Sequence, residues 1–280
     1  MMATHHVAAA GTALAVHTAG AGRPLVLLHG FPLDHRMWEA QAPLAEHCHL
    51  IVPDLRGFGG SAATRPQSVA AMADDVAALL AALRVPAPAV ICGLSMGGYV
   101  AQHLAVRHPD RVAALVLVDT KLEADTPEAR AARDDLAAKV GRLGQGILAD
   151  AMIPRLLAAA PVAGGLPHRA ATEAALRRMI VEQPVASIQA ALAALGARPD
   201  MTTALRDVRV PTLLVVGAED AITPPECLER AETIMPCARL LVVPAAGHMT
   251  PLEQPAVFNA AVLEFLRHPP GTLGGAPHRA

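Results

Sequence analysis

Short apolar runs alternate with longer alanine- and leucine-rich stretches along most of this chain, and this alternation limits the folds that it can adopt. Runs that are apolar throughout are typical of strands buried on both faces of a parallel sheet. Helical patterns follow several of them, which predicts an α/β fold built from βαβ units with right-handed crossovers. The six clearest runs are Leu25–Leu28, His49–Val52, Ala89–Cys92, Leu115–Val118, Thr212–Val216 and Leu240–Val243, and the clearest helical patterns are Ser68–Leu83 and Tyr99–Arg107.

Two segments depart from this alternation. Near the start, Val7–Ala10 and Ala13–His17 flank a Gly-Thr pair, which predicts an antiparallel hairpin at the edge of the sheet. Between Lys121 and Asp200 the strand runs stop, and prolines interrupt a helical pattern. We therefore expect a helical insertion that lies over the sheet.

These patterns predict the domain organisation. We expect a core formed by residues 1–120 and 201–267, with a helical cap formed by residues 121–200. The tail, residues 268–280, is rich in Gly and Pro and is expected to be disordered.

The composition excludes several function classes. Hydrophobic residues make up 53% of the chain, so a sizeable core can be buried. The formal net charge is −2 and the basic residues are scattered, which argues against a nucleic-acid-binding protein. The longest apolar runs, such as Val112–Val118, are too short to span a bilayer.

The cysteines and the N-terminus bear on location. The four cysteines form no CxxC pair and have no metal-ligand spacing, and Cys92 lies in an apolar run as expected of a buried free thiol. The first residues lack a charged region followed by an apolar stretch, so a signal peptide is not expected. We predict a soluble, cytoplasmic protein.

The segment from Gly93 to Gly97 (GLSMG) carries the strongest chemical signal. It matches G-x-S-x-G and lies between the apolar run Ala89–Cys92 and a helical pattern. This strand–turn–helix context is typical of a nucleophile elbow, in which a sharp turn exposes the serine at the end of a strand. The alternative is a chance glycine-rich turn, because the motif alone has few fixed positions. We take Ser95 as the candidate nucleophile.

A serine hydroxyl needs a base, and the base needs an orienting acid. Among 13 histidines, we favour His248, which lies in a loop between the last apolar run and the next helix. We expect Thr250 to be the N-cap of that helix, with Glu253 completing a capping box. We favour Asp220 as the acid, since Ser, Asp and His then fall on successive loops. Asp119, after another strand, is the main alternative, and Glu219 is a third candidate.

The motifs GLSMGG, GAEDAITP and AAGHMTPLEQP around these residues resemble the signature loops of the α/β-hydrolase superfamily, and they occur in its chain order. The resemblance covers about residues 7–266. It implies a mostly parallel eight-stranded sheet flanked by helices, with a helical cap. Some relatives place the acid at the position of Asp119, so this alternative stays open.

The resemblance also implies an oxyanion hole and a substrate pocket. His29-Gly-Phe-Pro32 resembles the family's HG-x-P loop, so the backbone N–H groups of Phe31 and Met96 are the expected oxyanion donors. We expect the substrate to contact Gly30, Phe31, Met96, Ile222 and Met249. Two further residues, Asp54 and Arg56, lie in a stretch similar to the family's D-x-R-G-x-G-x-S loop and are expected to be structural. Trp38 is expected to pack in the core, with a position in the pocket wall as the alternative.

The resemblance implies an esterase or lactonase that needs no cofactor or metal. A serine at the elbow excludes relatives that use aspartate or cysteine there. The phrases GLSMGGYVAQ and LVLVDT look most like the small carboxylesterase and 3-oxoadipate enol-lactonase branch. We predict hydrolysis of small to medium, largely apolar esters or lactones. The alternatives are a cofactor-free perhydrolase or haloperoxidase-like enzyme, an acyltransferase, a lyase or a ligand-binding receptor. The sequence gives no indication of the oligomeric state.

Overall fold

An eight-stranded sheet forms the centre of the molecule in a computed structural model that describes residues 2–9, 11–62, 68–85, 88–159 and 169–269. The strand order is β1-β2-β4-β3-β5-β6-β7-β8. Strands β1 and β2, and β2 and β4, pair antiparallel, whereas all other neighbours pair parallel. The strands are β1 (Ala3–Ala9), β2 (Thr12–Ala19), β3 (Pro24–Leu28), β4 (His49–Pro53), β5 (Ala89–Leu94), β6 (Val112–Val118), β7 (Thr212–Gly217) and β8 (Ala238–Val243).

Each of the six predicted strand runs lies inside an observed strand. Strands β3, β5 and β7 are buried along their whole length, as expected for parallel strands covered on both faces. Strand β8 closes one edge and is half exposed. The N-terminal hairpin is confirmed as β1 and β2, although residue 10 of the predicted run lies outside the described residues.

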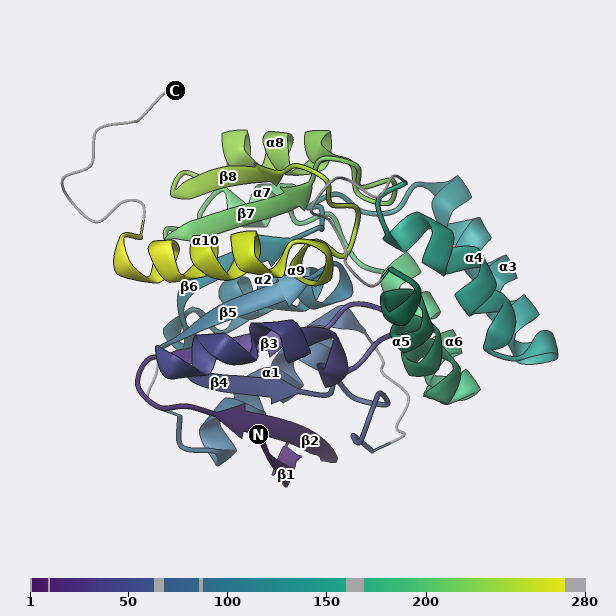
Figure 1. Cartoon of the computed structure of the whole chain (residues 1–280), viewed down its shortest axis with the longest axis horizontal. Helices are drawn as coiled ribbons and strands as arrows, with labels where there is room; N and C mark the ends of the chain where they lie inside the picture. Colours follow the sequence, from purple (N-terminus) through teal and green to yellow (C-terminus); the bar gives the residue numbers. More distant parts are fainter. Residues whose placement is uncertain (1, 10, 63–67, 86–87, 160–168, 270–280) are drawn as a thin grey trace.

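Helices cover both faces of the sheet (Figure 1). Helices η1 (His35–Glu46) and α10 (Pro255–Arg267) lie on the face toward the viewer, and α1 (Val69–Ala82) and α2 (Met96–Arg107) lie behind it. On the near face Trp38 is fully buried, with its ring 6.1 Å from that of Phe258, which confirms its expected packing role. Helix α8 (Pro225–Ile234) packs on β7 and β8.

A group of helices separates β6 from β7 and lies beyond the carboxyl ends of the parallel strands (Figure 1). No strand occurs among the described residues of this stretch, as the sequence predicts. Within it, residues 160–168 are not described, and residues 270–280 of the predicted tail also lie outside the described chain. The helices beyond the strand ends are α3 (Pro127–Leu143), α4 (Gly146–Leu156), α5 (Arg169–Glu182) and α6 (Val185–Gly196). The short helix α7 (Thr202–Leu205) follows them and lies instead against α2 and α8.

Gln183, between α5 and α6, ties these helices to two loops of the sheet. Its side-chain amide donates to Asp34 Oδ2 over 2.9 Å and accepts from the N–H of Gly59 over 2.9 Å. Nearby, Arg36 forms ion pairs with Asp34 at 2.7 Å and with Glu182 at 2.6 Å. The bond between Gln183 and Asp34 is buried, and together with the others it holds helices α5 and α6 in a defined position over the sheet edge.

No single described helix is long and apolar enough to cross a bilayer. Among the described residues, only α5 and α6 taken together have the length and hydropathy of a membrane span, but the two helices are bent by 96° relative to each other.

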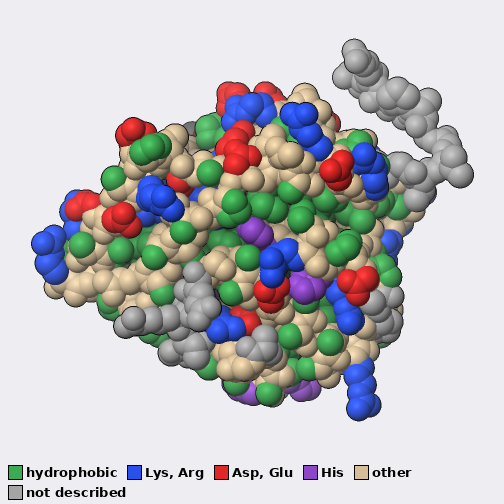
Figure 2. Space-filling view, turned by 180° about the vertical axis from the view of Figure 1, so that it is seen from behind, with side chains coloured by type: hydrophobic (Ala, Val, Ile, Leu, Met, Phe, Trp, Pro, Cys, Tyr) green, Lys and Arg blue, Asp and Glu red, His purple; other side chains and the backbone are tan. Residues whose placement is uncertain are grey.

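On the face of the molecule seen in Figure 2, basic and acidic side chains lie interspersed with apolar ones.

The turn after β2 generates a stability prediction. Gly20 and Gly11 have nearly equal positive φ angles of 75° and 77°, but only at Gly20 would a Cβ atom overlap backbone, at the carbonyl oxygens of Ala45 and Cys48. We expect Gly11→Ala to lower the free energy of unfolding by about 1 kcal/mol through backbone strain alone, and Gly20→Ala to lower it by several times more. Urea denaturation of both variants measures the difference, and equal losses would contradict the packing described for Gly20.

Candidate active site

Ser95 occupies a sharp turn between β5 and α2. Its backbone angles, φ 51° and ψ −110°, lie in a region that costs a non-glycine residue conformational energy. Two hydrogen bonds hold the turn: the Ser95 N–H donates to the carbonyl of Val118 over 2.9 Å, and the hydroxyl of Thr120 donates to the Ser95 carbonyl over 3.0 Å. The side chain of Ser95 is only partly exposed. The predicted strand–turn–helix context of this serine is therefore confirmed.

The glycines of the motif are explained by close backbone contacts. A Cβ atom on Gly93 would overlap the carbonyl of Gly97, and one on Gly97 would overlap the carbonyl of Leu28 in the neighbouring strand. A Cβ on Gly98 would lie 2.7 Å from the hydroxyl oxygen of Thr120. The strained turn can thus pack against β3 and β6 only because these positions lack side chains.

His248 and Asp220 form a buried pair at the same edge of the sheet. Nδ1 of His248 lies 2.8 Å from Oδ2 of Asp220, and both side chains are nearly inaccessible. The other carboxylate oxygen, Oδ1, accepts the N–H groups of Ile222 and Thr223 over 2.8 and 2.9 Å. Since an ionised carboxylate can only accept, the proton of a neutral His248 is placed on Nδ1, which leaves Nε2 as an available base.

The electrostatics of the pair favour charge separation. Burial opposes the charged forms of both groups, but the attraction between them and their hydrogen bond outweigh it. The pKa of Asp220 is therefore lowered, and the pKa of His248 is raised above its ordinary value. Thr223 adds to this arrangement, because its hydroxyl donates to Asp220 Oδ2 over 2.8 Å and lies 3.3 Å from His248 Nδ1.

Asp119 lies close by but has different partners. Its carboxylate accepts the N–H of Gly217 over 3.0 Å, the N–H of Thr250 over 3.1 Å and the hydroxyl of Thr250 over 3.0 Å. Complete burial, reinforced by the negative charge of Asp220, raises the pKa of Asp119 to about 7. Glu219, the third candidate, instead accepts the N–H of Ala159 over 3.2 Å. Of the three acids, Asp220 is the one hydrogen-bonded to His248.

The helix after His248 begins differently from the prediction. Helix α9 (Thr250–Glu253) has Met249, not Thr250, as its N-cap, and no side chain caps it. The Thr250 hydroxyl is engaged with Asp119 instead. Glu253 does reach back to the loop, where its Oε1 accepts the N–H groups of Gly247 over 2.8 Å and Met249 over 3.2 Å. Its Oε2 accepts the N–H of Ala158 over 2.7 Å, so this carboxylate joins the His248 loop to the helical layer.

The loop after β3 lies beside Ser95. A Cβ atom on Gly30 would lie 3.7 Å from Cβ of Ser95, an ordinary contact distance, but only 2.9 Å from Cδ2 of Leu94, so the leucine side chain would have to shift. His29 is fully buried, and burial lowers its pKa. Its Nε2 accepts the N–H of Leu55 over 2.9 Å, so Nδ1 carries the proton and donates to the Gly30 carbonyl over 3.0 Å. The neutral imidazole thereby fixes the loop that presents Phe31.

A cavity of about 350 Å³ opens between the sheet edge and the helical layer. Phe31 and Ile222, both predicted to contact the substrate, line it together with Thr223. Met96 and Met249 are fully buried, so their contact with a substrate stays a prediction.

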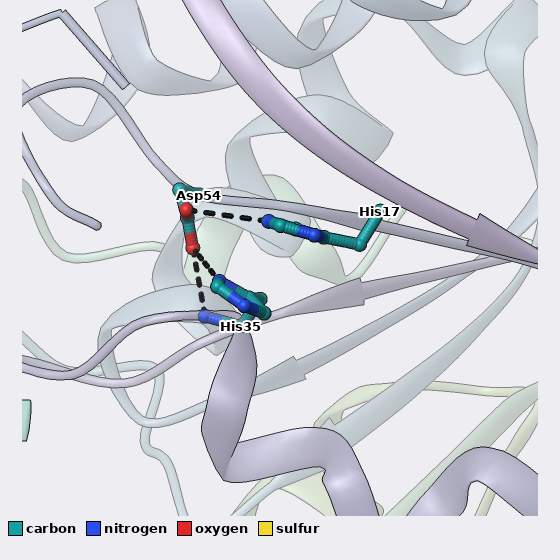
Figure 3. Close-up of side chains that lie close together, drawn as sticks. All are labelled: His17, His35 and Asp54. Atoms are coloured by element: carbon teal, nitrogen blue, oxygen red, sulfur yellow. Dashed lines mark hydrogen bonds and ion pairs between the residues drawn. The ribbon is translucent and has the colours of Figure 1, made fainter. Parts of the chain in front are cut away.

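Asp54 organises a separate cluster, shown in Figure 3. Its Oδ1 lies 2.8 Å from Nδ1 of His35, and its Oδ2 lies 3.5 Å from Nε2 of His17. The ligand atoms are close enough together for a metal ion, but the two imidazole rings stack at 3.5 Å and 18°. The ring nitrogens thus lie in nearly parallel planes that do not converge on one ion, which fits a carboxylate that accepts the Nδ1–H of His35 better than a tetrahedral metal site.

The predicted structural roles of Asp54 and Arg56 agree with their contacts. Asp54 also accepts the N–H of Gly60 over 2.8 Å, which closes the loop after β4. Arg56 forms an ion pair with Asp75 of α1, in which its Nε donates over 2.6 Å.

Glu253 generates a prediction that concerns the His248 loop. Glu253→Gln keeps one acceptor oxygen but turns an NH₂ group toward a backbone donor, so we expect a loss of about 1–3 kcal/mol in the free energy of unfolding. Amide hydrogen exchange at Gly247 and Met249 should also become faster. Denaturant titration and exchange followed by mass spectrometry measure both effects. Glu264→Gln, at an exposed position of α10, is the control and should change neither; the same result for Glu253→Gln would contradict this role.

Comparison with known proteins is consistent with this geometry. Residues 23–255 match the model of the alpha/beta hydrolase fold family. The chain is 32% identical over 263 residues to a pimeloyl-[acyl-carrier protein] methyl ester esterase of Edwardsiella ictaluri, with 91% of this chain and 97% of the relative covered. It is 36% identical over 256 residues to the enzyme of the same name from Aromatoleum aromaticum, with 82% of this chain and 93% of the relative covered.

Solved structures show the same similarity. A thermophilic esterase from Thermogutta terrifontis, solved with malate bound, is 39% identical and superposes with a TM-score of 0.89 over 95% of this chain and 98% of that one. The enol-lactonase from Burkholderia xenovorans LB400 is 27% identical, with a TM-score of 0.86 over 94% and 100% of the two chains. With its mostly parallel sheet, its serine elbow and a family match over most of its length, the chain belongs to the α/β-hydrolase fold family.

Proposed function

We propose that this protein is a serine esterase or lactonase in which Ser95 is the nucleophile, His248 the general base and Asp220 the orienting acid. The observation that carries the proposal is the buried 2.8 Å contact between His248 and Asp220 at the sheet edge where Ser95 sits on its strained turn. A serine on such a turn and a histidine–carboxylate pair at the same edge of the sheet are the components that acyl transfer requires.

The reaction would proceed through an acyl-enzyme. His248 Nε2 takes the proton of Ser95 as Oγ attacks the ester carbonyl, and the backbone N–H groups of Phe31 and Met96 hold the oxyanion. Asp220 keeps the proton of His248 on Nδ1 and stabilises the cation. His248 then protonates the leaving alcohol, and water activated by the same imidazole releases the acid.

The named activities of the relatives support esters and lactones as the substrate class. The curated relatives act on the methyl ester of an acyl chain, and a structural relative is an enol-lactonase. These activities favour hydrolysis over perhydrolase, acyltransferase, lyase or receptor functions. The cavity beside the site has apolar walls that include Leu136, Met152 and Leu192, which supports small to medium substrates with a largely apolar chain. The four free thiols support the cytoplasmic location expected from the sequence.

The choice between the two acids gives a direct test of the proposed triad. Asp220→Asn should lower kcat for para-nitrophenyl butanoate by about 10⁴-fold, because the amide favours the wrong tautomer of His248. Asp119→Asn should lower kcat less than about tenfold, since it weakens about one hydrogen bond to the backbone. Steady-state kinetics on both variants, with Ser95→Ala as the inactive reference, measures the difference. A larger loss for Asp119→Asn would reject Asp220 as the orienting acid.

The raised pKa of His248 predicts the pH dependence. His248 must be neutral to accept the proton of Ser95, so activity should fall as the pH drops through its pKa. Because Asp220 raises this pKa, the acidic limb of the kcat/KM profile should have its midpoint above the value of about 6.5 for a free histidine. A midpoint well below that value would mean that the carboxylate does not stabilise the imidazolium.

A further inference from the structure

The cavity beside the proposed triad has a charge pattern that the ester chemistry does not explain. One end is lined by Phe31, Ile222 and Thr223, which places it next to the loop beside Ser95 and to the Asp220–His248 pair. From there it extends under α3, α4 and α6, where Leu136, Met152 and Leu192 form apolar walls. A substrate whose ester lies at Ser95 would therefore extend its remaining chain along this cavity.

Three of the side chains that line the cavity are basic and only one is acidic. The basic ones are Lys121, Arg133 and Arg155, and the acidic one is Asp125. Because the chain as a whole has a formal net charge of −2, this local excess of positive charge is not a consequence of its overall composition.

Asp125 does not balance this excess, because three cations share it. Its buried carboxylate lies 2.5 Å from Nε of Arg133, 2.9 Å from Nη1 of the buried Arg198 and 3.6 Å from Nζ of Lys121. Burial raises the pKa of Asp125, but Arg133 and Arg198 outweigh this effect and lower it, so Asp125 is ionised and contributes one negative charge. A single carboxylate thus faces three positive charges, of which Lys121 and Arg133 are about a quarter exposed toward the cavity.

Arg155 adds a further positive charge at the exposed rim. Its Nη2 donates a long hydrogen bond of 3.5 Å to the carbonyl of Ala221. Within the described part of the chain, no carboxylate lies in ion-pair contact with it. Arg133 and Arg198 pair with Asp125, whereas Arg155 is available to bind an anionic group of a ligand.

We propose that the cavity selects substrates that carry a carboxylate at the end remote from the ester, held by Lys121, Arg133 and Arg155. This inference rests on the proposed esterase function and adds a substrate class to it. The apolar walls would bind the methylene chain between the two groups, and a partly buried carboxylate would form charge-assisted hydrogen bonds with the cations. Half-esters of dicarboxylic acids have this chemistry.

Matched pairs of substrates test the charge preference. The mono-para-nitrophenyl esters of adipic and suberic acid are compared with para-nitrophenyl hexanoate and octanoate, which have the same number of acyl carbons but no second carboxylate. We expect kcat/KM to be about tenfold higher or more for the half-esters at low salt, mostly through a lower KM. The ratio should shrink as the ionic strength rises, because salt screens the partly exposed cations.

Charge-removing variants locate the effect. The double variant Lys121→Met, Arg155→Met removes two of the three cations and should lower the ratio of half-ester to neutral ester severalfold, and each single variant should lower it less. Arg133 is kept in these variants because it forms an ion pair with Asp125. Arg142→Met, at an exposed position of α3 outside the cavity, is the matched control and should leave the ratio at its wild-type value. Thermal melting of each variant verifies that it is folded.

The outcomes separate this inference from the proposed function. A ratio near one in the wild-type enzyme, or a ratio in the double variant that equals the wild-type value, would overturn the carboxylate site while leaving the esterase intact. If neither half-esters nor neutral esters are hydrolysed, the proposed function itself fails. A preference that is lowered in the Lys121 and Arg155 variants, but kept in Arg142→Met, is the result that the charge pattern predicts.

Discussion

The strained backbone of Ser95 is the feature on which the rest of the site depends. A non-glycine residue holds a positive φ angle only where its surroundings enforce it. Here the enforcement comes from hydrogen bonds to Val118 and Thr120 and from close contact with the neighbouring strand at Gly97. The strain is therefore maintained by the packing of β3, β5 and β6, which also brings the loops that follow the strands to one edge of the sheet.

Buried carboxylates position the loop that carries His248. Glu253 accepts the N–H groups of Gly247 and Met249, which flank the histidine, and Asp119 accepts the N–H of Thr250. These two acids therefore hold the backbone on both sides of His248 without a hydrogen bond to its ring. Asp220 is the acid that does contact it. A division of this kind explains how several carboxylates can lie near one imidazole while only one orients its proton. Through Ala158, Glu253 also makes the position of the loop dependent on the helical layer above it.

Much of this arrangement could be predicted from local sequence. The strand runs, the serine elbow and the order of Asp220 and His248 are encoded in short segments, because apolar periodicity and glycine spacing reflect local constraints. The start of α9 was predicted wrongly, since the Thr250 hydroxyl is taken by Asp119, a partner that lies 131 positions earlier in the chain. The same limit applies to the hydrogen bond that the N–H of Leu55 donates to His29 and to the ion pair between Arg198 and Asp125, whose partners lie far apart in the chain. These depend on which distant segments the fold brings together, and the sequence contains no local signal for them.

The central claim is that Ser95 is an activated nucleophile in the folded protein, and covalent labelling tests it most directly. The native protein is treated with a fluorophosphonate probe at neutral pH, and the adduct is located by peptide mass spectrometry. The account predicts a single adduct on Ser95 that is lost in His248→Ala and in protein denatured before labelling, because only the assembled site deprotonates this hydroxyl. An unlabelled Ser95 in the native protein, or labelling that is indifferent to His248, would contradict it.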